Sequence, residues 1–206
     1  MDASYTMHPW GWHDKYVGQW TIEIPLSPEQ YGVFGHGCLL DIVAEVLDVI
    51  GDVFSPTQIE CPVEHTLFDR PLPLPHEVVR LALDRQWSFL AQAEDYEPSC
   101  DIYGVSHIYV RNATGVTRAP VPHVIDLRLE CDLGWRPIAR VSVNTKCDAW
   151  LPQTLDGYDN AIVGSANGPM LSGKLIALEA RLGGEIAETL TEFDGVKVER
   201  YGLKNV

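Results

Sequence analysis

Two neighbouring segments with strict alternation of apolar and polar residues constrain the fold of this chain most. Residues 123–131 and 135–144 both alternate, and the turn Asp132-Leu-Gly134 separates them. The apolar positions are Ile125, Leu127, Leu129, Cys131, Ala139, Val141 and Val143. A period of two places alternate side chains on opposite faces of a β-strand, and a short turn containing Gly joins two strands into a hairpin. We therefore predict an antiparallel hairpin with one face in a core.

The rest of the chain mixes strand patterns with helix patterns. Strands are predicted for residues 17–24, 101–111 and 196–201, with one short strand possible within the Pro-rich stretch 55–75. Helices are predicted for residues 37–54 and 169–182, a helical spacing recurs in 76–93, and a short helix is expected after Glu185. Pro169 suits a first turn capped by Asn167 or Ser165, and Gly183 suits the end of that helix. The order predicts a single α+β domain over residues 1–206, a mostly antiparallel β-sheet packed against two or three helices.

Four carboxylates form a stripe on the first predicted helix, with no basic residue beside them in the sequence. The acidic stripe consists of Asp41, Glu45, Asp48 and Asp52. Steps of four, three and four residues place these side chains on one helical face, while most other positions are apolar. Like charges at this spacing repel by roughly 0.2–0.5 kcal/mol per pair. The pattern favours a surface that attracts cations, with a plain solvated helix face as the alternative.

The negative charge is concentrated in the first third of the chain. Residues 1–69 hold eleven Asp or Glu and one base, Lys15, whereas the whole chain has a net charge of −14. Nucleic acids and anionic lipids bind Lys/Arg patches, so this balance argues against both as partners and favours a basic protein. No run of eighteen apolar residues and no basic-apolar leader is present, and five scattered cysteines are typical of reduced thiols. We therefore expect a cytoplasmic protein that does not enter membranes.

No motif in the sequence identifies a catalytic, metal or cofactor site. His36, Cys38, Cys61 and His65 have soft-ligand side chains, but their spacing lacks the close pairs of structural zinc sites. Cys100 with His107, or Cys147 with His123, would supply a nucleophile and a base only by chance proximity. We expect no metal, no cofactor and no catalytic residue.

Aromatic and histidine side chains crowd the N-terminus. They are His8, Trp10, Trp12, His13, Tyr16 and Trp20. Such a cluster serves as an anchor at an interface, or as a flap that closes the core. Asp148 and Trp150 mark a second conspicuous turn, in which Trp150 suits a core position and Asp148 a turn cap.

The sequences SVNTKCDAWLPQTLDG and SANGPMLSGKLIALEARLG contain the motifs Asp-Ala-Trp-Leu-Pro and Ala-Asn-Gly-Pro. This stretch resembles the C-terminal half of uncharacterised bacterial proteins of polymorphic-toxin immunity type, encoded near toxin and secretion-system cassettes. The resemblance covers about fifty residues and implies an immunity-like role. Its motifs have no assigned chemistry, so it implies no functional residue.

Charge and resemblance together favour a cytosolic immunity protein that binds and neutralises a cognate bacterial toxin. The acidic stripe would meet a basic active-site cleft of that toxin, with Trp10 and Trp12 as anchors beside Asp41, Glu45, Asp48 and Asp52. The alternative is a small-molecule-binding protein or an enzyme of unknown reaction, in which the N-terminal Trp/His cluster lines a pocket together with Asp148 and Trp150.

Overall fold

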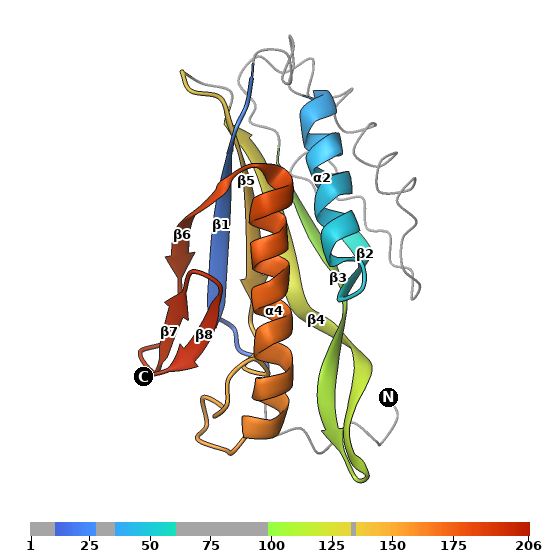
Figure 1. The fold of residues 1–206 in the computed structure, drawn as a ribbon, viewed down its shortest axis with the longest axis vertical. Helices are drawn as coiled ribbons and strands as arrows, with labels where there is room; N and C mark the ends of the chain where they lie inside the picture. The colour runs from blue at the N-terminus through green and yellow to red at the C-terminus, as the bar shows by residue number, and fades with distance from the viewer. Residues whose placement is uncertain (1–10, 28–35, 61–98, 133–134) are drawn as a thin grey trace.

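A computed structural model describes residues 11–27, 36–60, 99–132 and 135–206, with the side chains of 36–40 left aside. Figure 1 shows the arrangement: a tall, twisted antiparallel sheet with two helices lying across one of its faces. The elements, in chain order, are β1 Gly18–Pro25, α2 His36–Ile50, β2 Phe54–Glu60, β3 Ser99–Asn112, β4 Gly115–Asp132, β5 Ile138–Thr145, α4 Ala161–Leu182, β6 Glu185–Leu190, β7 Val196–Glu199 and β8 Gly202–Asn205. The chain therefore has the α+β architecture predicted from its sequence.

The main sheet has six strands in the order β2-β3-β4-β5-β1-β6, and every pairing is antiparallel. The predicted hairpin is confirmed as β4 and β5, with Leu127 opposite Val143 and Leu129 opposite Val141. β7 and β8 form a separate two-stranded ribbon beside β6.

The core lies between the sheet and the two helices. Alternate residues of β1 contribute Trp20, Ile22 and Ile24, as the sequence predicted, and the hairpin contributes its whole predicted apolar set. From the other side, α2 contributes Ile42, Val43, Val46, Leu47 and Ile50, and α4 contributes Val163, Leu171, Leu175 and Leu178. Burying each such side chain stabilises the fold by about 1.5–3 kcal/mol relative to exposure. Two helices on one face are thus enough to complete a single core.

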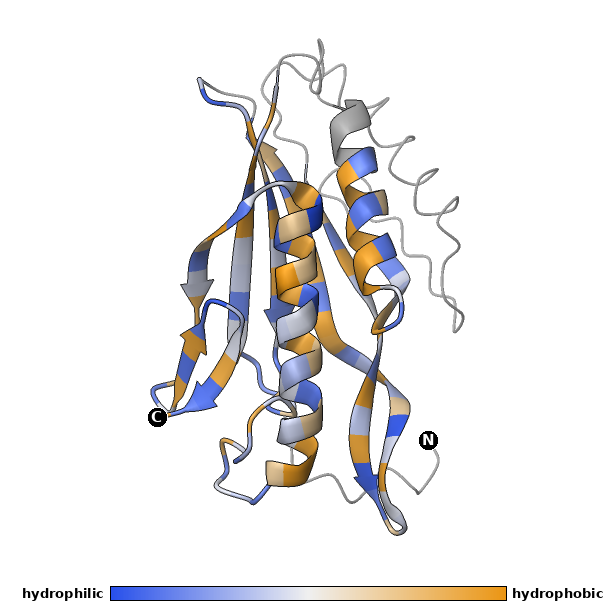
Figure 2. Ribbon diagram, in the orientation of Figure 1, coloured by the Kyte–Doolittle hydropathy of each residue, from blue (hydrophilic) through white to orange (hydrophobic). Residues whose placement is uncertain are grey.

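The opposite face of the sheet is polar, which produces the alternating colours along the strands in Figure 2. The residues that β3, β4, β5 and β1 place on this polar face are Asp101, Tyr103, Asp126, Arg128, Glu130, Arg140, Ser142, Asn144, Gln19, Thr21 and Glu23. Within the described residues no helix packs against this face. Ion pairs connect neighbouring strands here, with Arg140 between Glu23 (3.0 Å) and Glu130 (3.5 Å).

Several predicted boundaries were wrong. α2 ends at Ile50, so Asp52 lies in the turn before β2 rather than on the helix. α4 begins at Ala161 with Asn160 as its N-cap, and Pro169 lies inside the helix instead of in its first turn. The chain after Glu185 forms strand β6 in place of the expected short helix, whereas the end of α4 at Gly183, in a left-handed conformation with φ 65°, is confirmed. The predicted segment 76–93 lies outside the described residues.

No helix in the described ranges combines the length and the apolar character needed to cross a bilayer.

Candidate functional site

The acidic stripe lies beside α4, and basic residues of α4 pair with it. Arg181 contacts Glu45 and, at 3.9 Å, Asp48, while the Lys174 ammonium lies 2.5 Å from Asp52. The sequence places no base beside the stripe, but the fold brings Lys174 and Arg181 to it. These bases come from a helix more than one hundred residues further along the chain, so the local sequence could not reveal them.

Mutual repulsion within the acidic stripe would raise the pKa values of its carboxylates, but the pKa of Asp52 shifts in the opposite direction. A hydrogen bond from Lys174 lowers the pKa of Asp52, and the positive charge of the same side chain adds to the effect. Asp48 and Asp52 nevertheless remain 73% and 62% exposed, so solvent screens their ion pairs strongly. With two bases against four acids, the stripe keeps a net charge of −2.

Trp12 lies on the other side of the sheet from the stripe. Its backbone bridges to Cys147 at the end of β5, and its side chain is 51% exposed. Trp10 is outside the described residues. The stripe and Trp12 therefore belong to two separate surfaces.

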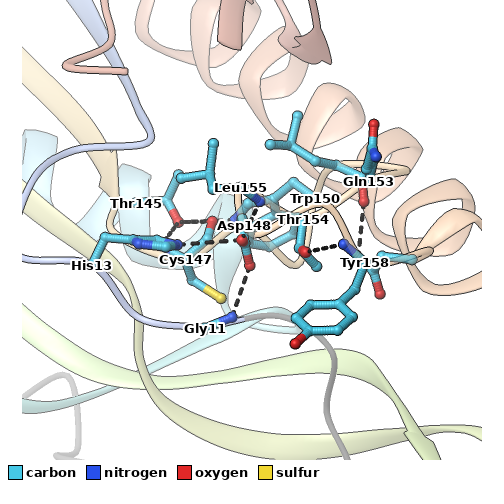
Figure 3. A network of polar contacts seen from close by, with 12 residues as sticks. Gly11, His13, Thr145, Cys147, Asp148, Trp150, Gln153, Thr154, Leu155 and Tyr158 are labelled. Carbon is cyan, nitrogen blue, oxygen red and sulfur yellow. Dashed lines mark hydrogen bonds and ion pairs between the residues drawn. The ribbon is translucent and has the colours of Figure 1, made fainter. Parts of the chain in front are cut away.

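A buried carboxylate fixes the N-terminal segment in this position. Asp148 is 1% exposed and accepts hydrogen bonds from the backbone of Gly11 (2.9 Å) and Leu155 (2.9 Å), and it lies 3.3 Å from the His13 ring (Figure 3). Because one carboxylate joins the N-terminal segment to the loop after β5, it holds His13 against the end of the sheet. The predicted role of Asp148 as a turn cap is confirmed.

Trp150 is part of the core rather than of a pocket. It is 2% exposed, and its indole donates a 2.9 Å hydrogen bond to the Thr145 hydroxyl. The neighbouring Cys147 thiol is fully buried, which raises its pKa. A buried thiol with a raised pKa is not a nucleophile at neutral pH. The predicted pocket at Asp148 and Trp150 is wrong, because both side chains are enclosed.

A polar cavity of about 310 Å³ opens between the N-terminal segment and the polar face of the sheet. Its lining residues are Trp12, His13, Gln58, Glu60, Tyr103, His123, Asp126 and Lys146. Trp12 and His13 thus do line a pocket, as the alternative hypothesis expected, but the sheet supplies the remaining side chains. The volume is at the lower end of the range found for small-molecule sites.

Strand register brings the central residues of this cavity together. Tyr103 on β3 lies opposite Asp126 on β4, and Asp126 lies opposite Asn144 on β5. Directly paired residues have their Cβ atoms about 4.5–5.5 Å apart. A bulge follows at once, where the register shifts after Tyr103 and His123 adopts a positive φ of 56°. Bulges redirect side chains at the ends of sheets, and this one lies at the border of the polar cavity.

Asp126 is the most perturbed carboxyl of the cavity. Burial raises its pKa to about 6, with a smaller rise from the negative charge of Asp101 and a fall from Lys146. Burial likewise raises the pKa of Tyr103 to about 12, helped by the surrounding carboxylates. Both shifts favour the uncharged forms. The cavity therefore holds a carboxylate that the protein stabilises poorly.

Two hydrogen-bond acceptors beside each other lack donors. Over the part of the chain that the structure describes, the buried atoms Asp126 Oδ1 and Asn144 Oδ1 have no hydrogen-bond partner. Asp126 also makes no ion pair with any described residue within 4.0 Å. Buried acceptors without donors cost about 1–3 kcal/mol each, and functional sites are where such groups persist.

The cavity is suited to holding a polar molecule. It presents carboxylates, the Lys146 ammonium, two imidazoles and the rings of Trp12 and Tyr103. Its described lining contains no serine, threonine or cysteine that would serve as a nucleophile. No group of three or more metal-ligating side chains occurs among the described residues; His36, Cys38, Cys61 and His65 fall outside that description.

Sequence reasoning missed Asp126, Lys146 and Tyr103. In the sequence, Asp126 is one of the polar positions of the alternating segment 123–131. The sequence shows polar residues at the outward positions of these strands, but only the strand register shows which of them lie side by side. Comparisons with protein-family models, curated proteins and solved structures found no match to this chain.

Proposed function

We propose that this protein binds a small polar molecule in the cavity between the N-terminal segment and the polar face of the sheet. The single observation that carries this proposal is the Asp126 carboxyl, which is half-buried at the cavity and lacks a donor for Oδ1 among the described residues. Removing a charged group from water without a partner is expensive. A ligand that donates hydrogen bonds to Asp126 would recover this cost.

The framework around Asp126 supports binding because it is already formed. Asp148 holds the His13 side of the cavity through three contacts, and antiparallel pairing fixes Tyr103 and Asp126 opposite each other. A preformed site loses little conformational entropy on binding. Trp12 supplies a partly exposed aromatic ring at the margin, suited to covering one side of a ligand.

A thermal-shift screen with a library of polar metabolites tests this function. A ligand at one hundred times its Kd stabilises a protein by about 2.7 kcal/mol. We expect at least one compound to raise the melting temperature of the parent, with a smaller rise in Asp126→Asn. Asp156→Asn, which removes an exposed carboxylate outside the cavity lining, is the matched control and should respond like the parent. The proposal fails if no compound shifts the parent, or if Asp126→Asn responds equally.

The acidic stripe favours a second candidate function, that of a cytoplasmic immunity protein which binds a cognate toxin. What supports it is the exposure of Asp48 and Asp52 despite their ion pairs, together with the net charge of −14. Exposed ion pairs contribute little stability. A basic partner can therefore replace the present ion-pair partners of these carboxylates with little loss of folding stability. Opposite fields of this kind accelerate association.

Association kinetics test the second candidate with the product of the neighbouring gene as partner. Neutralising Asp41, Glu45, Asp48 and Asp52 together should slow association at low salt and flatten its salt dependence. Neutralising the same number of acids on β6 and its flanks gives a control of equal charge change: Glu185, Glu188, Glu192 and Asp194. Equal slowing in both variants would assign the effect to net charge and exclude the stripe as the docking surface.

A further inference from the structure

The polar cavity has charges of both signs. Glu60 and Asp126 are its acids and Lys146 is its base, while His13 and His123 are its imidazoles. Counting Glu60, Asp126 and Lys146, the lining has a net charge of −1. A ligand with a net charge of +1 would balance it, and the presence of Lys146 means that this ligand also has room for an anionic group.

The Asp126 carboxyl marks where a cationic group would bind in the cavity. Asp126 lines the cavity, and it lies opposite Tyr103 of β3 on the same face of the sheet. A guanidinium or an ammonium donates charge-assisted hydrogen bonds to a carboxylate. Aromatic rings at the same cavity, those of Trp12 and Tyr103, attract cations through their faces.

Lys146 is placed to receive the opposite charge. Its ammonium lies 5.4 Å from the centre of the Tyr16 ring and makes no ion pair with a described carboxylate. It acts on Asp126 only through the longer-range attraction that lowers the pKa of that carboxyl. A carboxylate on the ligand would therefore find an available cationic partner at one side of the cavity.

We propose that the ligand is a basic amino acid or a molecule of the same type, with a guanidinium or amine bound at Asp126 and a carboxylate bound at Lys146. This inference rests on the proposed function of the cavity as a small-molecule site. Its volume of about 310 Å³ accommodates one molecule of this size. Both ends of the ligand are needed, because either charge alone would leave one side of the cavity uncompensated.

Isothermal titration calorimetry at pH 7.5 with three probes tests this assignment on the full chain. Arginine carries both groups, citrulline replaces guanidinium by a neutral group of the same shape, and agmatine lacks the carboxylate. We expect arginine to bind at least about tenfold more tightly than citrulline, which corresponds to 1.4 kcal/mol. Agmatine should also bind more weakly than arginine. Equal binding of arginine and citrulline would overturn the cationic subsite.

Two variants assign the ends of the ligand. Asp126→Asn should weaken arginine binding about tenfold or more. Lys146→Gln should weaken arginine but leave agmatine unchanged, because agmatine has no carboxylate to lose. Circular dichroism confirms that each variant is folded, and Asp156→Asn is the control. If Lys146→Gln weakens both probes equally, the anionic subsite is excluded.

The same measurements distinguish a wrong ligand class from a wrong binding site. If arginine fails to bind at millimolar concentration but another polar compound stabilises the parent through Asp126, the ligand class is wrong and the small-molecule site stands. If neither arginine nor any library compound binds, both proposals are wrong. A heat signal that is identical in the parent and Asp126→Asn means binding elsewhere, and it also overturns the assignment.

Discussion

The buried Asp126 carboxyl should make the stability of the protein depend on pH in a defined window. Its pKa rises from 3.8 to about 6 on folding because burial disfavours the charged form. A raised folded pKa means that the contribution to stability is fully present below the unfolded pKa and is lost as the pH rises through about 6. Between pH 4 and pH 7.5 the parent should therefore lose stability through this group.

The size of this loss follows from the shift. One pKa unit corresponds to 1.36 kcal/mol, so the rise at Asp126 corresponds to about 3 kcal/mol. In Asp126→Asn this pH-dependent part disappears, although burying the amide adds a constant cost of about 1–3 kcal/mol. The variant should gain about 3 kcal/mol on the parent between pH 4 and pH 7.5. For a chain of this size that equals roughly 6–12 °C in melting temperature.

Urea unfolding followed by circular dichroism at half-unit steps from pH 4 to pH 7.5 measures this difference. The charges that act on Asp126, those of Asp101 and Lys146, are present in both proteins. So are the other charged or polar groups of the cavity lining, which include Glu60, Tyr103, His13 and His123. Asp156→Asn should give a curve parallel to that of the parent. If the curve of Asp126→Asn is also parallel to that of the parent, burial does not raise the pKa of this carboxyl, and the proposal of a ligand site at the cavity fails.

Three further predictions concern the scaffold. Asn167 is fully buried and forms hydrogen bonds with the backbone of Tyr109 and Ala149. Asn167→Ala should therefore lower the free energy of unfolding, measured with urea, by about 2–4 kcal/mol. A smaller loss would mean that water replaces the amide. Gly104→Ala would place a Cβ 2.3 Å from the Ser55 carbonyl and should lower the melting temperature, whereas Gly173→Ala, with open space, should not. The double variant Lys174→Gln/Arg181→Gln should gain melting temperature with added NaCl, because the acidic stripe is then unpaired; equal salt responses in parent and variant would contradict the pairing.

The sequence predicted those parts of the fold in which local pattern and tertiary environment agree. In β1 and in the β4–β5 hairpin, strict alternation coincides with one buried and one polar face. The first half of α4 was missed because Gly164, Gly168 and Pro169 are poor helix formers. Gly164 lies where a Cβ would be 2.3 Å from the Leu151 carbonyl, so close packing rather than propensity selects that residue.

The candidate site could not be predicted for a different reason. Two of its residues, Tyr103 and Asp126, lie on different strands, and only the register places them opposite each other. A shift of one residue would turn each side chain to the other face. The pairing of Glu45 with Arg181 likewise depends on how α2 and α4 pack. Trp12 and His13, which line the cavity, were placed at a pocket only by the alternative hypothesis, which rested on an aromatic cluster visible in the sequence alone.

The pKa of Asp126 itself, measured by carbon-13 NMR of its carboxyl, tests the central claim most directly. We expect a pKa of about 6 for Asp126 in the free protein. Saturating arginine should lower this value, because a bound cation favours the charged carboxylate. A free-protein value at or below the ordinary 3.8 would show that Asp126 already has its partner within the chain, and would contradict the proposal that the cavity awaits a ligand.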